Sequence, residues 1–329
     1  MVRAADDDTL RLYDVASGTL LKTLGCKTYG VSAVAFTHSP LCVLTASGAH
    51  RSDHDVRYHS LHDNTYLRFF KARARAVPAA LGMPLMRPLS RWRAQGHSQR
   101  VLSLEMSPKS DAFLTAGADC CARLWDVRTN VCCGVMRTGA APVAAWDHQG
   151  LVFGVVTSDG VLKLFDARGY DQGPFDTVAF GPTGPAGAPQ RATSLAFSLD
   201  GKQILVKAGD VALVLDAYNG QRLHAFAPPV APHAPPTQPA LTPDARAVLC
   251  GGADAHIHVY SAATGAEVAA WRGHTGVPTQ TKWSPRRALA ASGCTHGGLA
   301  LWIPQAEGGN AHAHTQGGGA QPQPPAPEW

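Results

Sequence analysis

The sequence predicts an all-β fold, a seven-bladed β-propeller with an incomplete first blade. Two passages, residues 96–125 and 273–302, align without a gap, and each runs from Gly-His to Trp. Weaker copies of this pattern recur along the chain, and the intervals between their ends are 46, 66, 40, 50, 45 and 42 residues. A period of about 40–45 residues is typical of four-stranded propeller blades. The alternation of apolar and polar residues over 102–106 is typical of a half-buried strand.

Fixed spacings within the copies identify the pattern as that of WD repeats. A proline stands 17 residues before the tryptophan of both long passages, at Pro108 and Pro285. A hydroxyl residue stands ten before the same tryptophan, at Thr115 and Ser292. Aspartate stands six residues before the end of five copies, at Asp7, Asp53, Asp119, Asp159 and Asp254. The seven copies end on expected third strands, at Tyr13, His59, Trp125, Phe165, Leu215, Tyr260 and Trp302.

The blade that ends at Trp125 carries the complete polar set of a WD repeat. We expect its loop histidine, strand hydroxyl, turn aspartate and strand tryptophan to form one buried hydrogen-bonded chain, because buried polar groups need partners. These residues are His97, Thr115, Asp119 and Trp125. The last blade keeps only His274, Ser292 and Trp302, with His296 in place of the aspartate. The repeat register favours a structural role for both loop histidines over the alternative of catalytic bases.

The composition indicates one large folded region followed by a tail. The chain has 329 residues, 45% of them hydrophobic and 16% charged, and residues 1–304 carry all seven copies. Residues 305–329 are rich in Gly, Pro, Gln and His, which predicts a disordered tail. No apolar run long enough for a transmembrane helix occurs, and the acidic start lacks the apolar segment of a secretion signal. Eight cysteines in such a chain indicate reduced thiols and a cytosolic or nuclear compartment.

Residues 71–95 interrupt the repeat as a basic insertion. This segment holds six Lys and Arg residues and no acidic one, whereas the whole chain has a formal net charge of +5. The rest of the chain is therefore close to neutral, and its charge does not indicate nucleic-acid binding. Trp92 between Arg91 and Arg93 leaves open a stacking contact with nucleic acid. The Arg/Ala/Pro composition favours a solvated loop that protrudes from the blades, or an intron translated in error.

Cysteine pairs at residues 120–121 and 132–133 raise the alternative of a zinc site. Adjacent residues on a strand point to opposite faces, so neither pair easily directs both sulfurs at one ion, and zinc sites prefer a two-residue gap. His312 and His314 are a weaker candidate, for which a solvated low-complexity tail is the simpler interpretation. No serine nucleophile elbow and no phosphate-binding glycine loop occur in the right context. The sequence predicts no metal, no cofactor and no catalytic residue.

Three segments resemble one particular WD-repeat family. They are His59-Ser-Leu-His-Asp-Asn-Thr-Tyr-Leu-Arg-Phe-Phe70; Gly96-His-Ser-Gln-Arg-Val101 with Met106-Ser-Pro108 and Leu124-Trp-Asp-Val-Arg128; and Lys163-Leu-Phe-Asp-Ala-Arg-Gly-Tyr-Asp-Gln-Gly-Pro-Phe175. Together they resemble the WD-repeat adaptor subunit of COMPASS-type SET-domain histone methyltransferase complexes. Members of that family also belong to nuclear protein-phosphatase-one and cleavage and polyadenylation complexes. The resemblance covers residues 6–304 apart from the basic insertion.

The resemblance implies a non-catalytic nuclear adaptor in histone-three lysine-four methylation. Its expected partners are a SET-domain methyltransferase and the phosphorylated tail of transcribing RNA polymerase II, with an added role in transcription termination. Direct binding of nucleic acid or of membranes is not expected. The alternative is a generic WD-repeat scaffold in another assembly, such as a substrate receptor of a ubiquitin ligase, because the fold alone does not determine the partner.

The family-specific segments define a candidate partner face. The Leu-His-Asp-Asn and Gly-Pro-Phe segments both fall where a third strand turns into a fourth, so both are expected on the same rim of the disc. Tight-turn chemistry explains them equally well, because Asp63-Asn64 and Gly173-Pro174 are favourable turn pairs. The candidate residues are Leu61, His62, Asp63, Asn64, Tyr66, Arg100, Tyr170, Gly173, Pro174 and Phe175.

The start of the chain predicts a partial first blade. Residues 6–14 are expected as its third strand and residues 18–24 as its outer strand. No residues remain for its two inner strands or for the outer strand of the last blade. The family has roughly three dozen more residues before this point, and an extension of that length is expected to stabilise the ring by covering exposed sheet edges.

Overall fold

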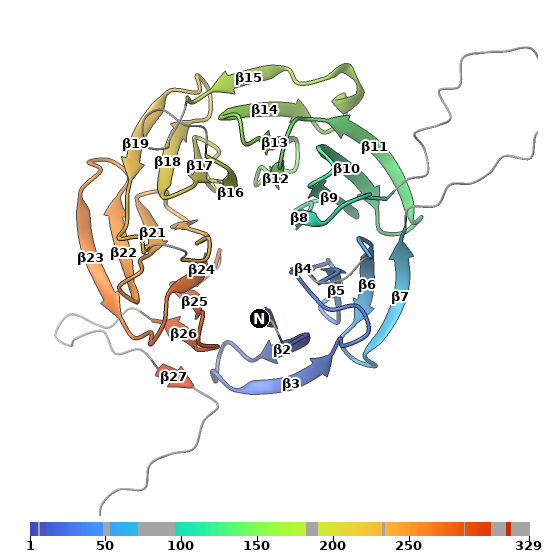
Figure 1. Ribbon diagram of the computed structural model, residues 1–329, viewed down its shortest axis with the longest axis horizontal. Coiled ribbons are helices and arrows are strands. Elements are labelled where there is room, and N and C mark those ends of the chain that lie inside the picture. Colours follow the sequence, from blue (N-terminus) through green and yellow to red (C-terminus); the bar gives the residue numbers. More distant parts are fainter. Residues whose placement is uncertain are drawn as a thin grey trace, which may run out of the picture.

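Seven antiparallel sheets stand around a central axis and form a β-propeller (Figure 1). Six of the sheets have four strands and the first has three, so the predicted seven-bladed propeller with an incomplete first blade is confirmed. The predicted basic loop lies, except for Lys71, outside the described residues. The computed structural model describes residues 1–5, 7–48, 53–71, 96–181, 190–231, 234–285, 287–303 and the backbone of 314–316.

Each complete blade runs from an innermost strand beside the axis to an outer strand on the circumference (Figure 1). The innermost strands are β4 (Ala33–Phe36), β8 (Val101–Met106), β12 (Val143–Trp146), β16 (Ala192–Phe197), β20 (Ala240–Leu241) and β24 (Pro278–Trp283). The second strands are β1 (Val2–Ala5), β5 (Cys42–Ala46), β9 (Ala112–Gly117), β13 (Val152–Val156), β17 (Gln203–Ala208), β21 (Ala247–Gly251) and β25 (Ala290–Cys294). The third strands are β2 (Thr9–Tyr13), β6 (Val56–Ser60), β10 (Cys121–Asp126), β14 (Val161–Asp166), β18 (Val211–Asp216), β22 (His256–Ser261) and β26 (Leu299–Trp302). The outer strands are β3 (Leu20–Gly25), β7 (Thr65–Phe70), β11 (Val131–Arg137), β15 (Asp176–Ala179), β19 (Arg222–Phe226), β23 (Glu267–Arg272) and β27 (His314–Gln316).

All seven repeat ends identified in the sequence fall on third strands. The second and third strands are nearly continuous apolar runs because neighbouring blades cover both of their faces. In β18, Ala212, Leu213, Val214 and Leu215 are all fully buried. A short apolar run bounded by turns is the pattern of such a buried strand, and the WD spacing fixes which run is the third.

The hydrophobic core is divided among the contacts between blades. Six clusters of buried apolar side chains fill the six contacts between consecutive blades from the first to the seventh. The seventh contact, which closes the ring, carries a polar bridge. Arg3 of β1 donates hydrogen bonds to the backbone oxygens of Cys294, Gly297 and Gly298, at 3.1, 2.7 and 3.2 Å. One arginine therefore ties the first blade to the last.

Two expectations for the ends of the chain are corrected. The first blade does not lack both inner strands, because β1 pairs with β2 and the apolar Val2 and Ala4 pack against the cluster between the first two blades. The last blade does have an outer strand, because β27 pairs with β26 inside the segment expected to be a structureless tail. The edge of β26 offers backbone donors and acceptors to any extended segment. The pairing with β27 therefore requires no particular side-chain pattern, and the sequence did not predict it.

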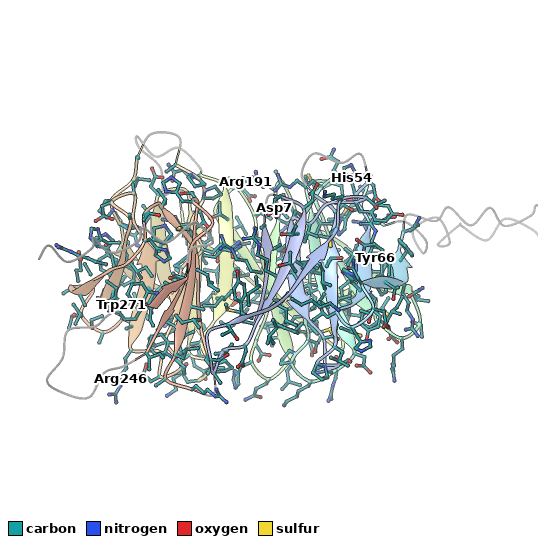
Figure 2. All side chains as sticks on the ribbon, turned by 90° about the horizontal axis from the view of Figure 1, so that it is seen from below. Asp7, His54, Tyr66, Arg191, Arg246 and Trp271 are labelled. Atoms are coloured by element: carbon teal, nitrogen blue, oxygen red, sulfur yellow. The ribbon has the colours of Figure 1, made fainter. Side chains whose placement is uncertain are left out.

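The disc has two faces, which Figure 2 shows from the side. Asp7, His54 and Arg191 lie at one face, which we call the Arg191 face. Arg246 lies at the opposite face, which we call the Arg246 face. Turns from first to second strands and from third to fourth strands lie at the Arg246 face. Turns from second to third strands, and the connections between blades, lie at the Arg191 face.

Candidate functional site

The complete polar set of the third blade forms one hydrogen-bonded chain. Nδ1 of His97 lies 2.9 Å from Oδ1 of Asp119, and its Nε2 lies 2.8 Å from Oγ1 of Thr115. Nε1 of Trp125 donates to the same Oγ1 at 2.9 Å. Burial lowers the pKa of His97. Burial alone would raise the pKa of Asp119, but the hydrogen bond and charge of His97 and the charge of Arg123 lower it to about 2. The chain thus links the loop before β8, the strands β9 and β10, and the turn between these two strands.

The last blade has a shorter version of this chain. Nε2 of His274 lies 2.6 Å from Oγ of Ser292, which accepts a 2.7 Å hydrogen bond from Nε1 of Trp302. Nδ1 of His274 is buried without a hydrogen-bond partner. In the third blade this atom faces Asp119, but here His296 replaces the aspartate. The aspartate-to-histidine replacement therefore leaves a buried ring nitrogen without a hydrogen-bond partner.

Replacing His296 with aspartate should repair this chain. We expect His296→Asp to raise the free energy of unfolding by about 1 kcal/mol, because Nδ1 of His274 would gain an acceptor. Urea denaturation of the purified chain measures the change. His296→Ala is the control, since it removes the imidazole without supplying an acceptor. Equal stabilities of the two variants would show that the unpaired ring nitrogen of His274 does not destabilise the blade.

A cation four residues after the turn aspartate was missed in the sequence. Asp7 pairs with Arg11 at 2.6 Å, and Asp119 pairs with Arg123 at 2.8 Å. Asp53 pairs with Arg57, and Asp254 lies 3.2 Å from His258. Residues four apart across a turn and the following strand can meet, so an aspartate followed at this spacing by a basic residue would have identified these pairs. In these pairs the aspartate side chains contact a basic side chain of the same blade, so the contacts are structural.

The Leu-His-Asp-Asn segment connects β6 to β7 at the Arg246 face, as expected. Leu61 is buried, and Asn64 has a φ of 55° and accepts a hydrogen bond from His59 at 3.0 Å. Tyr66 packs against the rings of Tyr29, His59 and Phe69. These three candidate residues therefore hold the turn and its strand in place.

Two candidate residues of this turn are available to a partner. The side chains of His62 and Asp63 are 74% and 62% exposed and form a 2.6 Å ion pair when the histidine is protonated. They project beyond the buried Leu61 at the Arg246 face. Tight-turn chemistry thus explains Leu61 and Asn64, whereas His62 and Asp63 remain a candidate contact surface.

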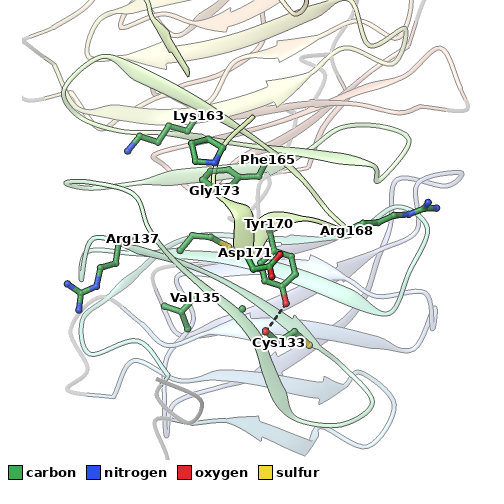
Figure 3. Close-up of a pocket in the computed structure, with 12 residues that line it drawn as sticks. Cys133, Val135, Arg137, Lys163, Phe165, Arg168, Tyr170, Asp171 and Gly173 are labelled. Carbon is green, nitrogen blue, oxygen red and sulfur yellow. Dashed lines mark hydrogen bonds between the residues drawn. The ribbon is translucent and has the colours of Figure 1, made fainter. Parts of the chain in front are cut away.

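The Gly-Pro-Phe segment connects β14 to β15 through a 3-10 helix, η2 (Tyr170–Gln172). The hydroxyl of Tyr170 donates a 2.8 Å hydrogen bond to the backbone oxygen of Cys133 in the neighbouring blade. Gly173 has a φ of 97°, and Phe175 is 60% exposed. A cleft of about 630 Å³ lies between this segment and β11 (Figure 3). The segment shares its face with Leu-His-Asp-Asn, but the third blade separates the two.

Arg100 does not belong with the other candidate residues. It lies in the connection before β8, and its backbone oxygen accepts a hydrogen bond from Ala118 in the turn between β9 and β10. Both segments lie at the Arg191 face, because second-to-third turns and blade connections meet there. The grouping with Leu61 and Tyr170 was wrong, since sequence proximity to the repeat motif does not report which end of a strand a residue occupies.

The two cysteine pairs lie at opposite ends of the antiparallel pair formed by β10 and β11. Cys121 is opposite Arg137, whereas Cys132 is opposite Trp125. In the described part of the chain, no group of three or more His, Cys, Asp and Glu side chains is placed to hold a metal ion. Nor does any described helix have the length and apolarity required to cross a membrane.

Comparison with known proteins agrees with this architecture. Residues 88–126, which end in the third blade, match the family described as WD domain, G-beta repeat. The chain is 36% identical to Protein ANTHESIS POMOTING FACTOR 1 of Arabidopsis thaliana over 92% of this chain and 83% of that protein. A solved chain in a mitotic checkpoint complex shares the fold at 15% identity, with a TM-score of 0.68 over 93% of this chain and 84% of the other.

Two further relatives carry more specific names. The chain is 33% identical to the Set1 complex component swd2 of Schizosaccharomyces pombe over 66% of this chain and 53% of that protein. It is 32% identical to WD repeat-containing protein 82 of Drosophila melanogaster over 94% of this chain and 88% of that protein. Similarity of this extent covers nearly every blade. The chain therefore belongs to the WD-repeat family that includes WD repeat-containing protein 82.

Proposed function

We propose that this chain is a non-catalytic adaptor in a nuclear COMPASS-type complex that methylates lysine four of histone three. The observation that carries the proposal is the similarity to WD repeat-containing protein 82 over 94% of this chain, joined to that with the Set1 complex component swd2. In this proposal the propeller binds a SET-domain methyltransferase and holds it near chromatin. Its link to transcribing RNA polymerase II, through the phosphorylated tail, and to termination is the finer part of the proposal.

The geometry supports an adaptor. The conspicuous histidines of the repeat, His97, His258 and His274, each lie against a hydroxyl or carboxylate of their own blade. The hydrogen-bonding groups of these histidines therefore serve to hold the strands of each blade together. The exposed residues of the family-specific turns, His62, Asp63 and Phe175, project from a rigid rim instead. A rigid scaffold with exposed turn residues is suited to binding proteins.

Affinity purification from nuclear extract tests the proposal. The tagged chain should recover a SET-domain methyltransferase and its associated subunits, identified by mass spectrometry. A tagged WD-repeat propeller of another family is the control for non-specific recovery. Recovery of ubiquitin-ligase subunits in place of the methyltransferase would favour the alternative scaffold. Fluorescence anisotropy tests the proposed link to RNA polymerase II. The chain should bind a phosphorylated polymerase-tail peptide more tightly than the unphosphorylated peptide.

A further inference from the structure

We propose that the cleft between the third and fourth blades binds an extended partner peptide through its Asp or Glu side chains. The inference rests on the proposed adaptor function and names the chemistry of one of its docking sites. The cleft is lined by β11 of the third blade and by β14 and the η2 segment of the fourth. Its volume, about 630 Å³, is within the range of sites that take peptide side chains or small ligands.

The cleft lies where the fourth blade differs from the third and sixth blades. In the blades that end at Trp125 and Tyr260, the outer strand reaches the position opposite the aromatic residue. In the fourth blade, pairing with β15 stops at Leu164 and Asp176, so Phe165 has no partner on the outer strand. Residues 167–175 cross toward the third blade instead. The cleft lies between this segment and β11, with Phe165 in its lining.

The walls of the cleft are fixed in place. The hydroxyl of Tyr170 is held by the backbone oxygen of Cys133, at 2.8 Å. The Tyr170 ring lies directly over Gly134, where a Cβ atom would come within 2.2 Å of a ring carbon. The backbone N–H of Phe175 donates to the oxygen of Leu164 at 2.9 Å and ends the segment. A preformed site loses less conformational entropy on binding.

The charge of the lining favours an anionic ligand. Arg137, Lys163 and Arg168 line the cleft, against the single carboxylate of Asp171. Lys163 is anchored, since its Nζ donates to the backbone oxygen of Thr138 at 2.7 Å. Arg168 lies in the exposed turn beside Gly169. Complementary charge of this kind selects the partner and steers its approach.

The arrangement of these cations favours several carboxylates over one phosphate. Figure 3 shows the Arg137 and Lys163 side chains extending to one side and Arg168 to the other, with Tyr170 and Asp171 between them. A phosphate group is bound best where several donors converge on its oxygens. Cations at separate ends instead match acidic side chains spread along an extended chain. The exposed Phe175, next to the lining Pro174, offers apolar contact at the rim.

Fluorescence anisotropy with labelled peptides tests the assignment. The probe is a peptide of about twelve residues that alternates Glu and Ser, which spans about 40 Å when it is extended at roughly 3.3 Å per residue. The comparison peptides replace Glu with Gln, or carry phosphoserine among Gln residues. We expect the Glu peptide to bind at least about tenfold more tightly than the Gln peptide, and Arg168→Glu to weaken it by a similar factor. Arg191→Glu is the matched control on the opposite face and should change the affinity less than about twofold.

The possible outcomes distinguish failure of the cleft assignment from failure of the proposed adaptor function. Equal loss in both charge-reversal variants, or no preference for Glu over Gln, overturns the assignment. Tighter binding of the phosphoserine peptide than of the Glu peptide also overturns it. Thermal unfolding of both variants excludes a folding defect. If the unaltered chain recovers a methyltransferase from nuclear extract but the Glu peptide does not bind, the adaptor function is supported and the cleft assignment is wrong. If the Glu peptide binds but no methyltransferase is recovered, the cleft assignment is supported and the adaptor function is not.

Discussion

Trp125→Ala is expected to be the most damaging single truncation in the propeller. Trp125 is 2% exposed, and its ring packs against Phe70 and Phe113 in the cluster between the second and third blades. Removing a buried ring of this size costs about 3–5 kcal/mol. The loss of its N–H also breaks the chain through Thr115 and His97, which adds about 1–3 kcal/mol. The sum is a large part of the 5–15 kcal/mol that stabilises a typical domain.

Two variants isolate the contribution of the hydrogen-bonded chain. Tyr260 is 8% exposed and packs against Phe226, but it occupies the same repeat position in a blade without the full polar set. Tyr260→Ala should therefore cost less than Trp125→Ala, measured by urea denaturation. Trp125→Phe keeps most of the ring contacts and removes the N–H, and it should cost about 1–2 kcal/mol. If the two alanine variants lose equal stability, the chain contributes nothing special to its blade.

The repeat spacing predicted the parts of this fold that repeat. Third strands were placed in all seven blades from three features: the fixed spacings before Trp125 and Trp302, the aspartate six residues before the end of five copies, and the repeat interval. The same register identified His97, Thr115 and Asp119, because the chain they form depends on side chains at fixed offsets. The periodic pattern predicts these positions because every blade packs its second and third strands between two neighbouring blades in the same way.

The candidate site could be predicted only in part, because it depends on departures from the repeat. Tyr170 stood out in a family-specific segment, but its contact with Cys133 joins residues 37 apart across two blades. The late start of β15, at Asp176, has no side-chain signature, since backbone pairing is largely indifferent to sequence. Gly134 is required by the ring above it, and a lone glycine in a strand does not reveal what lies over it. The pairing of β27 escaped prediction for the same reason.

Glu105 is expected to make the stability of the propeller depend on pH. It lies on β8, and its Oε2 accepts a 2.8 Å hydrogen bond from the backbone N–H of Trp146 on β12. Ser103 does the same for Ala144 at 2.9 Å, so two side chains join the innermost strands of neighbouring blades. Burial raises the pKa of Glu105 to about 7, although the charge of Lys282 and the Trp146 N–H oppose the shift. The folded chain therefore favours the protonated form of this carboxyl.

The sign of the effect follows from the direction of the shift. A carboxyl whose pKa is higher in the folded state contributes stability below its unfolded value, near 4.5, and loses that contribution as pH rises through about 7. Between these values the unfolded chain releases a proton that the folded chain retains. One pKa unit corresponds to about 1.4 kcal/mol, so the loss between pH 4.5 and 7.5 is about 2–3 kcal/mol.

Glu105→Gln removes this dependence. The glutamine oxygen can still accept the N–H of Trp146, but the side chain cannot ionise. We expect the variant to be more stable than the unaltered chain by about 2 kcal/mol at pH 8 and to match it near pH 5. Urea denaturation across this range gives the comparison. Ser103→Ala is the control, because it removes the neighbouring hydrogen bond without a titrating group and should lower stability by about 1 kcal/mol at every pH. If the difference between Glu105→Gln and the unaltered chain is the same at pH 5 and pH 8, the carboxyl does not titrate in this range. The junction of the two innermost strands would then be held by a charged group that Lys282 stabilises fully.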